Sequence, residues 1–179
     1  MKITPVMQKF ILHWGEMGAR WGVNRTVAQI HALLFLAPEP LPAETISDAL
    51  GVARSNVSTS IKELQSWGLI KIVHVMGDRR DHFESLKDMW EMSLVIMEQR
   101  KRRELDPTLT MLRQAVLDSD TDRQTSKEIK ERMANALEFM ETFTGWYEQM
   151  RSVPRPTLLK LMRLGAKVTK FLGKETAEK

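Results

Sequence analysis

Apolar side chains recur every three or four residues through most of the sequence, which is the spacing of an amphipathic α-helix. Thr4 is suited to cap a first helix and Asn24 to cap a second. The prolines within residues 38–42 end the second helix, and Gly51 suits the C-cap of a short third helix over residues 43–50. The pattern therefore predicts a chain that is mainly α-helical.

The period changes after a fourth helix, which we expect over roughly residues 54–67. Its apolar positions form one narrow stripe of Val57, Ile61 and Leu64. Residues 69–75 are rich in β-branched side chains, Gly77 and Asp78 supply a turn, and residues 82–85 can return as a second strand. Helix, short helix, turn, helix and two-stranded ribbon is the order of a winged helix-turn-helix.

Helical spacing returns at Leu86, and the expected stripe consists of Leu86, Met89, Trp90, Ser93, Ile96 and Met97. Pro107 predicts a break, a further helix is expected to about Leu117, and residues 118–122 read as a polar loop. An amphipathic helix should follow Pro156, with an apolar face of Leu158, Leu161, Met162, Val168, Phe171 and Leu172. The fold class is thus mainly α with a small β-wing.

A coiled-coil-like stripe marks the longest predicted helix. Its members alternate steps of three and four residues: Ile129, Met133, Ala136, Met140, Phe143, Tyr147 and Met150. We interpret the stripe as a homodimer seam, with an intramolecular helix bundle as the alternative. The expected organisation is an N-terminal helix over residues 1–24, a winged helix-turn-helix over 25–86, and a helical dimerisation region over 87–179.

Charge is distributed unevenly along the chain. The net charge is +4, but residues 151–179 hold eight Lys or Arg against two Glu, so residues 1–150 carry −2. The basic balance therefore describes a tail and is not by itself evidence for nucleic-acid binding. Without cysteine, disulfides and thiolate metal sites are excluded. With no signal-peptide pattern and no long apolar run, we expect a cytoplasmic protein without stable membrane association.

Residues 26–91 carry a family resemblance. The matching segments are Ala43–Val52, Val57 with Ser58, Trp67–Ile70, and the wing sequence Gly77–Phe83 with its Asp-x-Arg pattern. They resemble the multiple-antibiotic-resistance regulator (MarR) superfamily. His82–Ser85 and Lys87–Glu91 look most like its glycine-betaine-synthesis repressor (GbsR) branch. The resemblance implies a dimeric DNA-binding transcriptional regulator, which we expect to be a repressor of a pseudo-palindromic operator.

The polar face of the fourth helix predicts contact with double-stranded DNA. Opposite the apolar stripe stand short hydroxyl, amide and basic side chains: Arg54, Ser55, Asn56, Ser58, Thr59 and Lys62. Such groups suit base edges and phosphates. A merely solvated face is the alternative, although such faces usually favour Glu, Lys and Ala.

In the wing, the family pattern implies that Asp78 and Arg80 pair to make the turn rigid while Arg79 or Arg80 reaches the minor groove. The alternative is a surface ion pair of little energetic weight. The basic run Arg100–Arg103 suits a solvated helix end better than a DNA-backbone patch, because cations stabilise helix C-termini.

An effector site is weakly indicated. Relatives in the GbsR branch respond to choline-like cations, and aromatic cages bind such cations. The candidates are Trp14, Trp21, Trp90, Trp146 and Tyr147, which can equally be core residues. The four histidines lack metal-ligand spacing and no catalytic motif is present, so we expect no enzyme, cofactor or metal.

Two further readings stay open. The winged helix can be a protein-interaction module without an operator, because the first 150 residues are net acidic. The amphipathic basic segment of residues 155–174 can lie on anionic lipid, on the dimer itself or on the DNA backbone.

Overall fold

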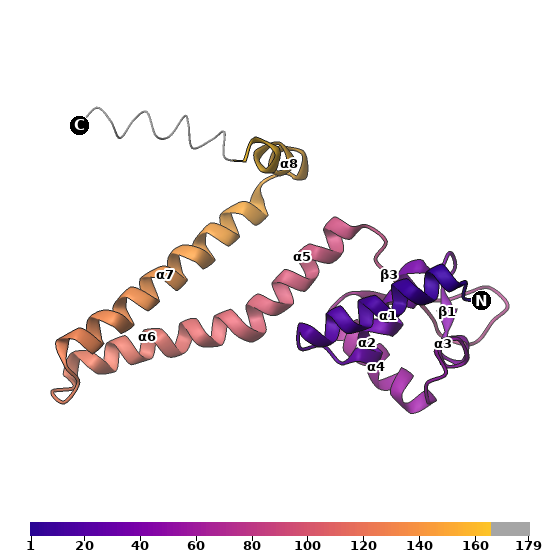
Figure 1. The fold of residues 1–179 in the computed structure, drawn as a ribbon, viewed down its shortest axis with the longest axis horizontal. Helices are drawn as coiled ribbons and strands as arrows, with labels where there is room; N and C mark the ends of the chain where they lie inside the picture. The colour runs from indigo at the N-terminus through magenta and orange to yellow at the C-terminus, as the bar shows by residue number, and fades with distance from the viewer. Residues whose placement is uncertain (166–179) are drawn as a thin grey trace. The chain divides into compact units, whose positions relative to one another are not determined.

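The chain forms two compact units, Met1–Arg102 and Arg103–Lys179, and a computed structural model describes residues 1–165 (Figure 1). The expected residues Val168, Phe171 and Leu172 lie outside the described part, as does much of the basic tail. Among residues 1–165, none of the helices combines the length and the hydropathy that spanning a bilayer requires.

The first unit combines helices with a small antiparallel sheet. Its elements are α1 (Pro5–Arg20), α2 (Arg25–Leu36), β1 (Leu41–Pro42), α3 (Ala43–Leu50), α4 (Arg54–Ser66), β2 (Ile70–Val73), β3 (His82–Ser85) and α5 (Met89–Arg100). The predicted caps are confirmed: the Thr4 side chain accepts a hydrogen bond from the Met7 N–H, and Asn24 accepts one from Thr26. The predicted helix–helix–helix–ribbon order is therefore present.

Helix α2 runs through the centre of the core. Its Ile30, Leu33 and Leu34 are fully buried. They belong to one apolar cluster with the inward residues of the other elements, among them Ile46, Val57, Leu64, Leu69 and Met92. This shared core fixes α3 and α4 against α2, so the outward face of α4 is held by packing on its inner side.

Helices α1 and α2 approach closely at two glycines. A Cβ atom on Gly18 would lie 2.6 Å from Cβ of Ala28, and one on Gly15 would lie 2.6 Å from Cγ of Gln29. Both distances are well inside van der Waals contact, so these positions need the smallest residue.

We expect Gly18→Ala to destabilise the protein by about 1–2 kcal/mol, because overpacking outweighs the gain in helix propensity. Gly145→Ala is the matched control: Gly145 lies inside a helix and nothing stands within 4 Å of its added Cβ. That variant should gain about 0.5–1 kcal/mol. Urea unfolding of both checks the prediction, and equal stabilisation by the two substitutions would contradict the close approach.

The lysine after the wing caps α2. Nζ of Lys87 donates to the carbonyl oxygens of Leu34 and Ala37, both at 2.6 Å, and of Phe35 at 3.1 Å. These carbonyls have no partner inside the helix because they stand at its C-terminal end. Lys87 thereby joins the end of the wing to the central helix.

The helix after the wing begins later than predicted. It starts at Met89, not Leu86, because the Asp88 side chain caps it by accepting hydrogen bonds from the N–H groups of Trp90 and Glu91. The predicted stripe was wrong in part, since Met89, Ser93 and Met97 are exposed while Ile96 packs on the core. The residues that pack on the core are Met92, Val95 and Ile96.

His31 of α2 is buried without a hydrogen-bond partner for Nε2 among the described residues. Its ring lies 6.1 Å from that of Trp14. Burial lowers the pKa of His31 to about 4, so the folded protein holds the neutral form.

Because the unfolded chain binds this proton at higher pH than the folded one, stability should fall as pH decreases from about 6.5 to about 4, by up to about 3 kcal/mol from His31. Unfolding free energies of wild type and His31→Leu across this range check the prediction. The variant should lose less stability on acidification, and parallel curves would contradict it.

The sheet has strand order β1-β3-β2, and both pairs are antiparallel. Strands β2 and β3 form the predicted wing ribbon. Strand β1 was missed, because the sequence pattern treats the prolines around Leu41 only as helix breakers. Leu41 pairs with Phe83 of β3, which ties the segment before α3 to the wing.

The second unit contains α6 (Asp106–Thr121), α7 (Lys127–Ser152) and α8 (Arg155–Leu164), with α6 and α7 side by side (Figure 1). A π-helical turn, Lys101–Leu105, precedes α6. It confirms an interruption near Pro107, which has no N–H to donate to the turn before it.

Helix α6 continues through the predicted polar loop. It ends at Thr121 rather than near Leu117, because the polar side chains bond back to their own helix. Ser119 Oγ donates to the Val116 carbonyl at 2.8 Å, and the Asp122 N–H donates to the Asp118 carbonyl at 3.2 Å. The loop itself begins at Asp122.

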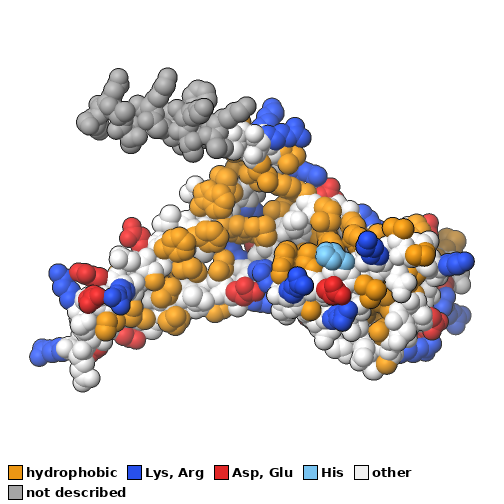
Figure 2. Space-filling model, in the orientation of Figure 1, with side chains coloured by type: hydrophobic (Ala, Val, Ile, Leu, Met, Phe, Trp, Pro, Cys, Tyr) orange, Lys and Arg blue, Asp and Glu red, His pale blue; other side chains and the backbone are white. Residues whose placement is uncertain are grey.

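The predicted stripe of α7 does not form one continuous seam. Tyr147 is buried and Met133, Met140 and Met150 are half-buried, whereas Ile129, Ala136 and Phe143 are exposed. Phe143 (43%) instead forms an exposed apolar set with Phe139 (68%) and Trp146 (55%), which the predicted stripe did not include. We call these three the α7 aromatic stripe. Figure 2 shows hydrophobic side chains gathered along this helix.

Candidate nucleic-acid interface

A tight turn of three residues connects α3 to α4. Gly51 adopts φ +64°, a left-handed conformation that favours glycine, and it is the predicted C-cap of α3. The Ser47 hydroxyl donates to the Val52 carbonyl at 2.7 Å across the turn. This geometry fixes the direction in which α4 leaves α3.

Helix α4 presents two distinct faces. Val57, Ile61 and Leu64 are buried in the core. All six residues expected on the opposite side are exposed: Arg54, Ser55, Asn56, Ser58, Thr59 and Lys62. The structure therefore brings the predicted polar set together on one helix surface, and DNA contact by these residues stays a prediction.

The N-terminal end of α4 combines an exposed positive charge with backbone N–H groups that no side chain caps. Ala53 provides no side-chain cap, so the first N–H groups lack the partner that Ser or Asp would give. The Arg54 side chain is 73% exposed, and its guanidinium stands 3.8 Å from the Glu44 carboxylate of α3. Such an exposed pair contributes little to stability, so Arg54 can exchange Glu44 for a phosphate at small cost.

The wing turn is closed by the predicted pair of Asp78 and Arg80. Nε of Arg80 donates to both carboxylate oxygens of Asp78, at 3.0 and 3.1 Å, and the Arg80 N–H donates to Oδ1 at 3.0 Å. Nε2 of His82 lies 3.5 Å from Oδ2 of Asp78. The hydrogen bonds from Arg80 hold the pKa of Asp78 well below its usual range, so the pair persists at any pH near neutrality.

The two wing arginines are therefore not equivalent. Arg80 is held by Asp78, whereas Arg79 is exposed and makes no hydrogen bond or ion pair with residues 1–165. The sequence left open which of them is free to reach a partner. The structure distinguishes them by what each side chain already binds.

Sequence reasoning missed the apolar tip of the wing. Met76 is fully exposed, and Val75 before it and Ile72 of β2 are exposed as well. Alternation along a strand indicates one outward face, but nothing in the pattern shows that residues 74–77 project into solvent. The contact of Glu44 with Arg54 was also missed, because the two residues meet only through the turn at Gly51.

The predicted aromatic candidates have separate environments. Trp14 stacks with Phe10, and their ring centroids are 5.4 Å apart. The Arg100 guanidinium lies over the Trp21 ring, 5.6 Å from its centroid. Trp90 stands in the first turn of α5. In the second unit, Trp146 is exposed and Tyr147 is buried, so these neighbours face different sides of α7. No observation favours a cage formed from them.

Two members of the basic run at the end of α5 bind protein groups. Arg100 donates to the Trp21 carbonyl at 2.6 Å, and Arg102 pairs with Glu98 at 2.8 Å. Among residues 1–165, no group of three His, Asp or Glu side chains is placed to hold a metal ion.

Residues 21–81 match the model of the MarR family. Among solved structures, a protein described as a transcriptional regulator is 21% identical with a TM-score of 0.54, covering 81% of this chain and 99% of its own. Together these matches show that the first unit has the winged-helix fold of the MarR family. No protein with curated annotation shows significant similarity to the chain.

Two other solved structures are similar at lower scores. MepR of Staphylococcus aureus in complex with DNA is 16% identical with a TM-score of 0.37, covering 76% of this chain and 91% of its own. A transcriptional regulator from Thermotoga maritima is 18% identical with a TM-score of 0.39, covering 83% and 94%.

Proposed function

We propose that this protein is a MarR-superfamily transcriptional regulator that binds a specific operator as a homodimer in the cytoplasm. The observation that carries the proposal is the exposed polar face of α4, whose opposite side is buried in the core. In a winged helix-turn-helix, the helix in this position enters the major groove. Short hydroxyls and the Asn56 amide suit base edges, and Arg54 and Lys62 suit phosphate or guanine.

The wing contributes the second contact in this proposal. Arg79, which has no partner among the described residues, reaches the minor groove, and Arg80 positions the turn through Asp78. In each protomer, the proposed DNA-contacting surface thus consists of the polar face of α4 and Arg79 of the wing. Its positive charge is modest. Because residues 1–150 carry a net charge of −2, non-specific binding to the DNA backbone is weak. Contacts to the bases then determine which DNA sequence is bound.

We assign dimerisation to the α7 aromatic stripe, which shares only Phe143 with the seam expected from the sequence. Phe139 and Phe143 stack at 6.4 Å, and Phe143 lies 6.3 Å from Trp146, so the stripe is a continuous apolar surface. A patch of this kind supports self-association, because soluble monomers rarely leave such aromatic area in water. Two-fold symmetry would place two copies of α4 about one DNA turn (~34 Å) apart on a pseudo-palindromic operator.

Placement in the GbsR branch rests on the resemblance of residues 82–91 together with the chain length and the long C-terminal helices, and repression rests on the resemblance to the MarR superfamily. In the structure, residues 82–91 form β3, the Lys87 cap and the start of α5, all of which serve the fold. The choline-like effector rests on the resemblance to the GbsR branch.

The proposal is tested by selecting sites from a random duplex library with the full chain and measuring fluorescence anisotropy on the selected duplex. At near 0.15 M salt, we expect binding at least about a thousandfold tighter than to a scrambled duplex of equal length. Equal, steeply salt-dependent binding to both duplexes would contradict a specific regulator.

A protein-interaction module is the second candidate, favoured by the apolar wing tip of Ile72, Val75 and Met76. Such a tip suits a protein partner as well as a DNA groove. This candidate predicts no enrichment in the selection and no binding to either duplex at low salt.

A further inference from the structure

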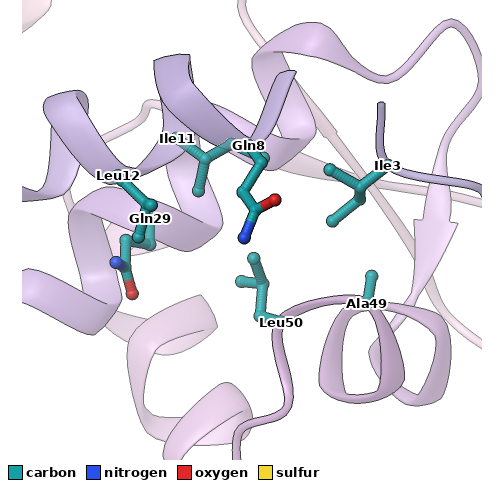
Figure 3. Close-up of a pocket in the computed structure, with 7 residues that line it drawn as sticks. All are labelled: Ile3, Gln8, Ile11, Leu12, Gln29, Ala49 and Leu50. Carbon is teal, nitrogen blue, oxygen red and sulfur yellow. The ribbon is translucent and has the colours of Figure 1, made fainter. Parts of the chain in front are cut away.

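A cavity of about 290 Å³ lies in the first unit, away from the outward face of α4. It is lined from α1 and the residues before it by Ile3, Gln8, Ile11 and Leu12, from α2 by Gln29, and from the end of α3 by Ala49 and Leu50 (Figure 3). Gln8 and Leu12 are exposed at its edge, so the cavity opens to solvent.

We propose that this cavity binds a small uncharged molecule with an apolar body and one amide-like or hydroxyl group. Five of the seven lining side chains are aliphatic, and none is charged or aromatic. An anion or a quaternary ammonium ion would lose its hydration without gaining a counter-charge or a ring face. The volume falls at the lower end of the range for small-molecule sites.

The two glutamines supply the polar recognition. Figure 3 shows the Gln8 amide pointing from α1 toward Leu50 on α3, with Gln29 beside Leu12. Neither side-chain amide makes a hydrogen bond with residues 1–165. Gln29 packs over Gly15, where an added Cβ would lie 2.6 Å from its Cγ and 3.2 Å from its amide Nε2. Each amide can donate and accept, which matches a neutral carboxamide or hydroxyl.

The cavity is connected to α4 through α3. Ala49 and Leu50 are the last two residues of that helix, and the Gly51 turn follows at once. A ligand that fills the space against Leu50 shifts the population of α3 positions and, through the turn, the direction of α4. This regulatory part rests on the proposed function, whereas ligand binding does not.

The test uses the full chain with ¹³C-labelled Ile and Leu methyl groups and three neutral probes: benzamide, p-cresol and 2-phenylethanol. Benzoate and benzylammonium are charged controls of similar size. We expect at least one neutral probe to give saturable methyl shifts at Ile3, Ile11 and Leu50 but not at Ile129 in the second unit, and the charged controls to bind at least about tenfold more weakly.

Gln8→Leu should weaken binding of that probe about five- to tenfold, the effect of one lost hydrogen bond, while Gln124→Leu in an exposed loop leaves it unchanged. Absence of saturable shifts with all three probes at about 10 mM, or equal binding by charged and neutral probes, would overturn the site. If Gln8→Leu and Gln124→Leu lose the same amount of probe affinity, recognition of the ligand by Gln8 is overturned.

Operator anisotropy with and without saturating probe separates the two parts of the proposal. A change in operator Kd of at least about threefold supports the link from Leu50 to α4. Methyl shifts with an unchanged Kd overturn the regulatory part and leave the binding site standing. Methyl shifts in a protein that binds no DNA contradict the proposed function alone.

Discussion

Replacing Phe143 and Trp146 together with serine is expected to convert the protein to monomers and to weaken operator binding by about a thousandfold or more. Burying one aromatic side chain stabilises an interface by about 1.5–3 kcal/mol, and a two-fold dimer loses each substituted side chain twice. Four such losses exceed the free energy that separates a nanomolar from a micromolar dimer. A monomer then engages one half-site without its partner's contribution.

Sedimentation equilibrium measures the change in assembly, and operator anisotropy measures the consequence. The fold itself should survive, because both side chains are already exposed in the single chain, at 43% and 55%. Leu117→Ser is the matched control, an exposed apolar residue on α6 that lies outside the α7 aromatic stripe. If Leu117→Ser dissociates the dimer and the double variant does not, the assigned seam is wrong.

Arg79→Ala should lower operator affinity by about 30- to 100-fold at near 0.15 M salt. Two wings lose one charge-assisted contact each, and every such contact is worth roughly 1–1.5 kcal/mol on a desolvated groove surface. The slope of log affinity against log salt should decrease, because about two fewer counterions are released per dimer. Thermal stability should not change, since Arg79 has no partner among the described residues.

Arg80→Ala is the informative comparison. Its side chain closes the turn on Asp78, so its removal frees the wing and also brings the Asp78 pKa back toward the ordinary carboxyl range. Operator binding by Arg80→Ala should then become sensitive to pH between about 5 and 4, where the wild-type carboxylate stays ionised. If the slope of log affinity against log salt decreases more in Arg80→Ala than in Arg79→Ala, the roles assigned to the two arginines are reversed.

Local chemistry made much of the first unit predictable. Thr4, Asn24 and Gly51 act where the sequence indicates, because a cap is decided by its own side chain and its nearest backbone groups. The narrow apolar stripe of α4 likewise identified its inner face, and so the outer polar set. The Asp78–Arg80 pair is separated by one residue and was expected from the family pattern.

The sequence-based predictions that were wrong or missing concern contacts between residues that are distant in sequence. Strand β1 forms because Leu41 pairs with Phe83 of β3. Helix α5 starts after a connector whose Lys87 side chain donates to the carbonyl groups at the end of α2. The α7 pattern merged two faces, since spacing alone does not tell which apolar residues find a partner within the unit. The cavity beside Gln8 requires three helices to be placed together, which no local pattern reports.

The most direct test of the central claim uses the absence of cysteine in the chain. Ser58→Cys on α4 and Met76→Cys at the wing tip, each carrying an iron–EDTA group, generate radicals that cut nearby DNA. We predict two clusters of cuts about one turn (~34 Å) apart on the selected operator. Cuts from residue 58 should be staggered across the major groove, and cuts from residue 76 across the minor groove. The wild-type chain, which has no cysteine, is treated with the same reagent as a control. Specific DNA binding through α4 and the wing would be contradicted if the variants cut the duplex no more strongly than this control, or if their cuts were spread evenly along the duplex.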